Sequence, residues 1–208
     1  IRIPQCPAQS GPCGTIPRDV CQLLNEQIGH EISAAERYSS MASFLKKEGA
    51  PPALVKKLES DAEEEIKHAN AFKAIIEKQG GEPQVRFPAN NDSGLNLPRN
   101  VRGTGETVEL VMKSLDEAIR MERHVAGKIE AICEATENGL TSTTNPMQRL
   151  GLRQVDEDLK PFVLEQVTAE KDLQLARAEV AKLAGDPDLP DLFEACERIF
   201  KSDEDNHS

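Results

Sequence analysis

The sequence predicts an all-α protein, a bundle of four long helices followed by a short fifth helix. Ala, Leu, Glu and Lys dominate the 208 residues, whereas aromatic residues make up 3% and Trp is absent. This composition favours helix over sheet. Apolar residues recur at helical spacing in four long stretches. A stretch without periodicity, rich in Pro, Asn, Gly and Arg, separates the second from the third.

The first two helices are expected to form an antiparallel pair. Pro17 suits the first turn of a helix that stops at Gly49, and the second helix runs from about Pro52 to Lys78, where Gly80 and Gly81 end it. The connection is short, so the two helices should be neighbours. Their apolar stripes are Leu24, Ile28, Ala35, Ala42 and Leu45, and then Leu54, Leu58, Ala62, Ala69, Phe72 and Ile76.

The stretch from Glu82 to Gly105 predicts a crossover between opposite ends of the bundle, because so long a loop in a compact domain needs such a role. The second and third helices would then be parallel. A third helix is expected at about 107–137, a polar loop at 138–145, a fourth helix at about 155–183 and a short fifth at 189–200. The expected inward residues of the third helix are Val111, Leu115, Ala118, Val125, Ile129 and Ile132. Those of the fourth helix are Leu159, Phe162, Val163, Leu173 and Val180.

The formal net charge of -11 argues against nucleic acid or an anionic membrane surface as a partner and is compatible with attraction of cations. No apolar run approaches the roughly 20 residues that a membrane span requires, so no span is expected. The chain begins at Ile1 rather than Met, which suggests a processed amino terminus.

The cysteines indicate disulfide bonds. Three of the five lie in a Pro/Gly-rich leader, and their spacing matches no zinc motif; the five are Cys6, Cys13, Cys21, Cys133 and Cys196. The leader cluster predicts one internal bridge plus a thiol available to another subunit, which would place the protein in an oxidising compartment. Sequons at 91–93 and 206–208 agree with that. We therefore expect secretion, or residence in the lumen of the secretory pathway.

These features predict three parts of the chain. Residues 1–16 form a Cys-bearing N-terminal extension, residues 17–200 the helical bundle, and residues 201–208 a polar acidic tail.

Each long helix carries one polar interruption of its apolar stripe, namely Glu31, Glu65, Glu122 or Gln166. Each lies roughly 12 to 15 residues from its helix start, which at about 1.5 Å per residue places all four at mid-height. His68 lies one turn after Glu65 on the same face. Burying ionised carboxylates without partners costs several kcal/mol, so a cation or a proton is expected there.

Three carboxylates, an imidazole and an amide suit iron or manganese. Three acids for one His exceed the need of one ion, so two ions bridged by Glu65 would balance the charge. Tyr38 lies two turns after Glu31 on the same face. It is either a core aromatic residue whose hydroxyl finds a partner, or a group that supports a metal ligand or supplies an electron. His30 and His124 lie off the stripes and are expected at the surface.

Taken together, these residues resemble the iron-oxidising heavy-type subunit of ferritin. The resemblance covers roughly residues 20–200 and rests on Glu31 with Tyr38 and Met41, on Glu65-x-x-His68 with Gly80-Gly81, on Glu122, and on Leu164-Glu165-Gln166-Val167. It implies a ferritin-like four-helix bundle with one long crossover and a short fifth C-terminal helix. It also implies a ferroxidase that oxidises Fe(II) with dioxygen and stores ferric mineral inside a hollow shell of about 24 subunits.

The resemblance also assigns roles to residues. Glu31, Glu65 and His68 would hold the first iron. Glu65 would bridge to a second iron, held by Glu122 with Gln166 nearby. Tyr38 would hydrogen-bond to a ligand, and Glu64 resembles the family's transit carboxylate.

The chain departs from the family's pattern in its leader, in two loops and in its iron channel. Its Cys-bearing leader resembles secreted ferritins such as those of insects, in which disulfides join heavy and light chains. The resemblance thus implies a homo-oligomer or a heavy/light hetero-oligomer linked through the N-terminal cysteines. The loops at 82–105 and 138–145 are longer than in the family's cytosolic members. In the family's iron channel, Asp156 matches the first acid but Leu159 replaces the second, so Asp156, Glu157 or Asp158 would serve.

Three other interpretations compete. A non-catalytic shell subunit that assembles with an active chain would lack several of the ligands present here. A bacterioferritin or rubrerythrin type of di-iron protein would need Glu-x-x-His on the fourth helix, where residues 165–168 contain no His. A secreted bundle of the cytokine kind would pair its inward acids with Lys or Arg and would elute as a monomer in gel filtration.

Overall fold

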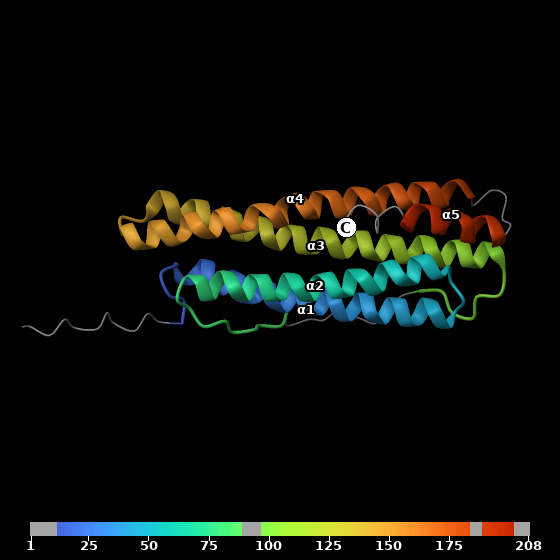
Figure 1. Ribbon diagram of the computed structural model, residues 1–208, viewed down its shortest axis with the longest axis horizontal. Helices are drawn as coiled ribbons and strands as arrows, with labels where there is room; N and C mark the ends of the chain where they lie inside the picture. Colours follow the sequence, from blue (N-terminus) through green and yellow to red (C-terminus); the bar gives the residue numbers. More distant parts are fainter. Residues whose placement is uncertain (1–11, 89–96, 184–188, 202–208) are drawn as a thin grey trace, which may run out of the picture.

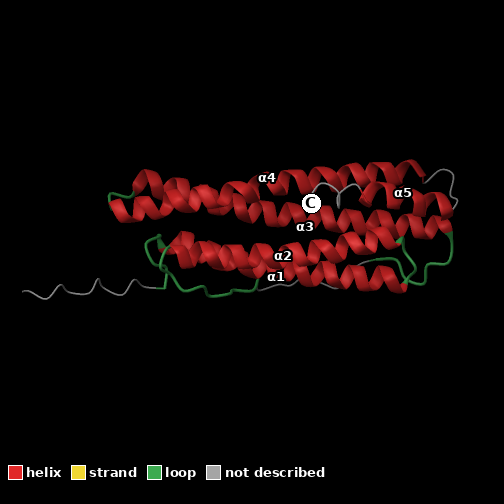
Figure 2. Ribbon diagram, viewed as in Figure 1, coloured by secondary structure: helices red, strands yellow, loops and turns green. Residues whose placement is uncertain are grey.

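The computed structural model describes residues 12–88, 97–183 and 189–201, and within these ranges every regular element is a helix (Figures 1 and 2). The predicted all-α class and the number of helices are confirmed. The helices are α1 (Arg18–Lys47), α2 (Pro52–Lys78), α3 (Thr104–Ser142), α4 (Pro146–Leu183) and α5 (Leu189–Lys201).

The four long helices form two antiparallel hairpins. Helix α1 packs mainly on α2 and α3 packs mainly on α4, while α1 also contacts α3 along the seam between the hairpins. Helices α2 and α3 begin at the same end of the bundle and run parallel, as the crossover predicted (Figure 1). Helix α5 packs against α2 and α4.

The core follows the predicted apolar stripes. Residues with almost no exposed surface include Leu24, Ile28, Leu45, Leu54, Leu58, Ile76, Leu115 and Ile129. Burying each such side chain contributes about 1.5 to 3 kcal/mol. Phe72 of α2 stacks on Phe162 of α4, with ring centroids 4.6 Å apart. The prediction that Val163 faces inward is wrong, since the residue is 44% exposed. Val163 follows the inward Phe162 directly, and each step along a helix rotates the side chain by about 100° around the axis.

Helix ends follow the chain's Pro and Gly residues. Pro52 is the first residue of α2, where its missing N–H leaves no donor unsatisfied. Gly80 ends α2 with a φ of 73°, a left-handed conformation that Gly adopts without steric cost. In this turn the N–H of Gly81 donates to the carbonyl of Ile76 at 3.0 Å.

The prediction of a loop at 138–145 is wrong, and so is the expectation that this connection is longer than in the family's cytosolic members. Helix α3 continues to Ser142 and α4 begins at Pro146, so three residues connect them. Asn145 caps α4, because its Oδ1 accepts from the N–H of Met147 at 3.0 Å. A Cβ at Gly139 of α3 would press on the Leu152 side chain of α4, so the two helices approach closely where polar residues had suggested a loop.

The last residues of the predicted extension pack on the bundle. Cys13 and Cys21 form a disulfide, which is the internal bridge that the leader cluster predicted. Thr15 binds Gln79 twice, through its N–H to the carbonyl and through its hydroxyl to the side chain, each at 2.9 Å. Ile16 is 4% exposed and belongs to the core. Cys6 and both sequons lie outside the described residues.

The first part of the crossover lies along α1. The backbone N–H of Arg86 donates to the carbonyl of Asn25 at 3.2 Å, and the N–H of Gln84 donates to the Asn25 side chain. Beyond the segment that is not described, the N–H of Val101 donates to Glu48, just past the far end of α1. The two described parts thus reach opposite ends of α1.

Gly29 provides the space for this contact, because a Cβ there would overlap the carbonyl oxygen of Arg86. We expect Gly29→Ala to displace residues 82–88 from α1 and to lower the free energy of unfolding by about 1 to 3 kcal/mol, the range typical of overpacking. Denaturant unfolding measures the loss, and limited proteolysis should show faster cleavage within 82–88. Gly127→Ala, at an open helical position, is the control and should not destabilise the protein.

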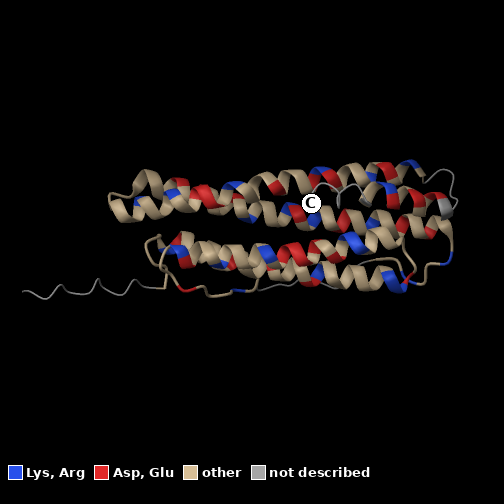
Figure 3. Cartoon of the chain, in the orientation of Figure 1, with Lys and Arg blue, Asp and Glu red and all other residues tan. Residues whose placement is uncertain are grey.

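Acidic and basic side chains are interspersed along the helices (Figure 3). Some ion pairs join neighbouring helices, such as Arg37 with Glu117 between α1 and α3 and Arg123 with Glu170 between α3 and α4. None of the described helices is long and apolar enough to cross a membrane.

Candidate metal centre

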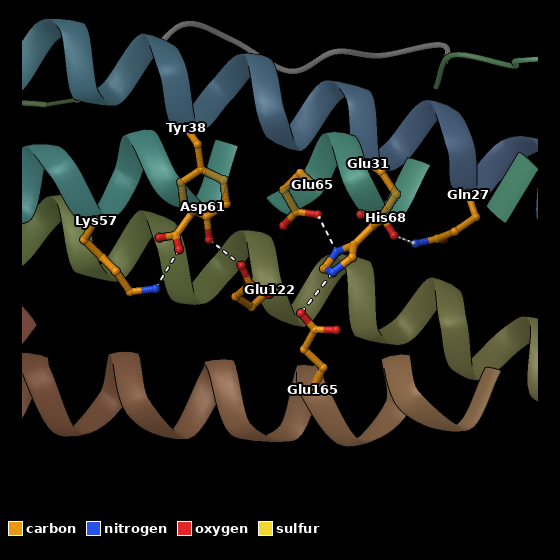
Figure 4. Close-up of polar contacts among 9 residues, drawn as sticks. All are labelled: Gln27, Glu31, Tyr38, Lys57, Asp61, Glu65, His68, Glu122 and Glu165. Carbon is orange, nitrogen blue, oxygen red and sulfur yellow. Dashed lines mark hydrogen bonds and ion pairs between the residues drawn. The ribbon is translucent and has the colours of Figure 1, made fainter. Parts of the chain in front are cut away.

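The structure brings the polar interruptions of the four long helices into the bundle interior, and Figure 4 shows those of α1, α2 and α3. All four are almost fully buried, with exposed fractions of 6% or less: Glu31 on α1, Glu65 on α2, Glu122 on α3 and Gln166 on α4. His68 on α2 is slightly more accessible, with 12% of its side chain exposed. The predicted residues therefore line the interior and do not point toward water.

One group consists of Glu31, Glu65 and His68, whose ligand atoms all lie within 4.8 Å of one another. His68 Nδ1 is 3.3 Å from Glu65 Oε2. Glu31 Oε1 accepts from the amide of Gln27 at 2.7 Å, whereas Glu31 Oε2 and Gln27 Oε1 have no hydrogen-bond partner. A buried acceptor without a donor is costly. These atoms thus suit a cation.

The second group surrounds Glu122. Tyr38 on α1 donates its hydroxyl hydrogen to Glu122 Oε1. With its amide oriented to satisfy both polar atoms, Gln166 donates to the carbonyl oxygen and to Oε2 of Glu122, each at 3.1 Å. The hydroxyl of Tyr38 therefore has a partner, as both predicted roles require, and that partner is a candidate ligand.

The electrostatics of both groups favour positive charge. Burial, followed by the hydrogen bond and negative charge of Glu65, raises the pKa of Glu31 well above its usual value. Burial and then the charge of Glu65 raise the pKa of Glu122 to about 7, against the lowering effect of the Tyr38 hydrogen bond. These carboxyl groups would hold protons when no cation is present, and a bound cation would displace the protons.

His68 connects the interior group to α4. Its Nε2 lies 2.9 Å from Glu165 Oε1, and its ring meets Phe162 edge-on at a centroid distance of 5.5 Å. Burial lowers the pKa of His68, but hydrogen bonds to Glu165 and Glu65 outweigh that effect and raise it to about 10. Glu64, which the resemblance singled out, forms a second candidate group with His68 and Glu165.

Sequence reasoning missed Glu165, Asp61 and Gln27. Asp61 lies four residues before Glu65 and is 9% exposed; its carboxylate binds Lys57 at 2.6 Å, and burial raises its pKa to about 6. Gln27 lies four residues before Glu31. Both could have been found as polar positions one turn from a predicted ligand on the same stripe. Glu165 gave no such signal, because it adjoins the stripe and reaches His68 only across the space between helices.

A cavity of about 870 Å³ lies between α2, α4 and α5. The lining residues include Tyr38, Glu122 and Gln166 of the candidate centre, Glu64 and Glu165, and Phe200 of α5. The cavity therefore reaches residues of the candidate centre.

Asp156 lies apart from the centre, toward the start of α4. Its Oδ2 is 3.5 Å from Lys160 Nζ, and 37% of its side chain is exposed. His124 is exposed as expected, but the expectation for His30 is only partly right, because His30 is half-buried and its Nδ1 is 3.2 Å from His124 Nε2. Burial and the positive charge of neighbours lower the pKa values of both, that of His30 to about 4.

Two helical hairpins that enclose a group of carboxylates, one imidazole and one amide define a ferritin-like bundle. The chain belongs to that family, since a family model for ferritin, described as the ferritin-like domain, matches residues 21–158. A comparison with curated proteins gives no match.

Solved structures share this fold. An engineered closed form of the Archaeoglobus fulgidus ferritin has a TM-score of 0.68 at 18% identity, over 88% of this chain and 96% of that chain. An open-pore ferritin from the same archaeon has a TM-score of 0.67 at 19% identity, over 89% and 96%. A humanized archaeal ferritin has a TM-score of 0.69 at 19% identity, over 88% and 96%. At these identities the likeness establishes the fold.

Proposed function

We propose that this protein is a heavy-type ferritin subunit, which oxidises Fe(II) with dioxygen at the mid-bundle centre and stores the product as ferric mineral inside a shell. Family membership indicates iron storage. The main observation in support of ferroxidase activity is the buried carboxylate of Glu31, which lies next to Glu65 and His68. Its Oε2 atom has no hydrogen-bond partner.

In this proposal Glu31, Glu65 and His68 hold one Fe(II) and Glu122, with Gln166 nearby, holds a second. Glu65 would bridge the two ions, which is supported by its contact with His68 and by the effect of its negative charge on the pKa values of both Glu31 and Glu122. Tyr38 keeps Glu122 oriented through its hydroxyl. Glu64 and Glu165 line the cavity and would receive Fe(II) on its way to the centre.

The chemistry follows from charge. Each Fe(II) gives one electron to dioxygen, and the ion that results carries one more positive charge. Three buried carboxylates stabilise Fe(III) more than Fe(II), since Coulomb attraction grows with the charge of the ion and is weakly screened in the interior. The protein thus supplies geometry and anionic charge, while the iron supplies the redox chemistry.

The direct test is Fe(II) oxidation in air by the purified protein, with the rate and the size of the active particle measured together. We expect rapid oxidation by a particle of about 24 subunits. A large particle without rapid oxidation would indicate a non-catalytic shell subunit. A monomer would contradict the shell.

We further propose that the protein is secreted and assembles alone or with a second chain type. The Cys13–Cys21 disulfide supports an oxidising compartment. It uses two of the three cysteines of the leader cluster, so Cys6 in the proposed extension of residues 1–16 would be the thiol available to another subunit. Non-reducing electrophoresis of the secreted protein should show a dimer that Cys6→Ser abolishes. Asp156 would contribute to an iron channel through the shell.

Replacing Tyr38 by Phe should slow the oxidation about tenfold. The change deletes only the hydroxyl that binds Glu122, and loss of a charge-assisted hydrogen bond of about 1.5 to 3 kcal/mol corresponds to a tenfold or larger effect. Stopped-flow absorbance measures the rate. If the hydroxyl were merely a satisfied core group, Tyr38→Phe would oxidise Fe(II) at the parent rate.

A further inference from the structure

A pair of histidines outside the candidate centre joins the two hairpins. His30 comes from α1 and His124 from α3, and their rings meet at 66° with centroids 4.9 Å apart. Nδ1 of His30 and Nε2 of His124 are 3.2 Å apart. His30 is half-buried and His124 is exposed, so the pair is open to water, whereas the adjacent Glu31 is fully buried in the interior.

This spacing suits a shared metal ion. Two nitrogens at 2.0 to 2.1 Å from one tetrahedral ion lie about 3.3 Å apart, close to the observed separation. We propose that His30 and His124 form a second metal site, which binds a borderline divalent ion such as Zn²⁺ with water completing the coordination. Imidazole ligands favour zinc, copper and nickel, whereas the carboxylate-rich centre inside the bundle favours iron or manganese.

Charged neighbours tune this site. Glu26 lies one turn before His30, and its negative charge acts on that ring. Lys128 lies one turn after His124, and its positive charge acts on both rings. Glu26 would attract a bound cation and Lys128 would repel it, so Lys128 should limit the affinity of the site for the cation.

Zinc binding to the full-length protein tests the proposal without reference to iron oxidation. Crystals soaked with Zn²⁺ and measured at the zinc absorption edge should show an anomalous peak between the two rings. In calorimetric titration, His124→Asn should lose one zinc equivalent per chain, or bind it at least tenfold more weakly. Lys128→Gln should bind it several-fold more tightly. Glu65→Ala, which removes the bridging carboxylate of the interior centre, should retain the peak.

The proposal is overturned if crystals soaked with Zn²⁺ show no peak between the rings, or if His124→Asn binds as many zinc ions as the parent with unchanged affinity. His124→Asn should also oxidise Fe(II) at the parent rate, because His124 points away from the interior. Failure of the iron proposal would leave the zinc result unaffected, so the two can be judged separately.

Discussion

Glu65→Ala should lose rapid Fe(II) oxidation, with a fall in rate of about 100-fold or more. Glu65 is shared by both proposed iron positions and also lies within hydrogen-bond distance of His68. A 100-fold loss corresponds to roughly 3 kcal/mol of the activation free energy, a reasonable cost for removing a bridging ligand. Stopped-flow absorbance under limiting Fe(II) measures the initial rate.

The same variant should remain folded, because removing one of several inward carboxylates relieves repulsion among them. Gel filtration and thermal unfolding should match the parent within a few degrees. Glu63→Ala is the matched control, since Glu63 is exposed on the same helix and the change in charge is identical. An unchanged oxidation rate in Glu65→Ala, or an equal loss in Glu63→Ala, would refute the assignment of the centre.

Metal-free protein should become less stable as the pH rises from 5 to 8. The folded state raises the pKa of Glu122 from 4.5 to about 7 and that of Glu31 in the same direction. The resulting stabilisation is complete below the unfolded pKa near 4.5 and is lost as the pH rises through the folded pKa. For Glu122 the loss is a few kcal/mol, at about 1.4 kcal/mol per pKa unit. The raised pKa of His68 likewise makes the folded protein less stable as the pH rises above 6.5.

Denaturant midpoints of the metal-free protein at pH 5, 6.5 and 8 measure this loss. Zn²⁺, which is redox-inert, should restore stability at pH 8 by supplying the positive charge that the protons had provided. Glu122→Gln is uncharged at every pH and should show a smaller pH dependence. A stability that rises steadily from pH 5 to 8 in metal-free protein would contradict the proposed electrostatics.

Most of the fold was predictable because periodicity and helix-end residues agreed. The bounds of α2 matched the prediction, since Pro52 and Gly80 mark its ends unambiguously. The α3–α4 turn was not predictable from the same signals. Residues 138–142, the last part of α3, include Asn, Gly, Thr and Ser, which have low helix propensity. The close approach of Gly139 to Leu152 exists only in the folded protein.

The inward positions of the candidate centre were predictable as well, because a carboxylate on an apolar stripe has nowhere else to point. Glu165 could not be found in this way, since its contact with His68 depends on the distance between α2 and α4. The pairing of His30 with His124 was missed for the same reason, because it depends on how α1 lies on α3.

The division into two hairpins has a mechanical consequence for the empty and loaded protein. Glu31, Glu65 and His68 belong to the α1–α2 hairpin, whereas Glu122 and Gln166 belong to the α3–α4 hairpin. Iron ions bound between the two hairpins would therefore hold the hairpins together. We expect the two hairpins to move slightly apart each time Fe(III) is released and to close again when the next pair of ions binds.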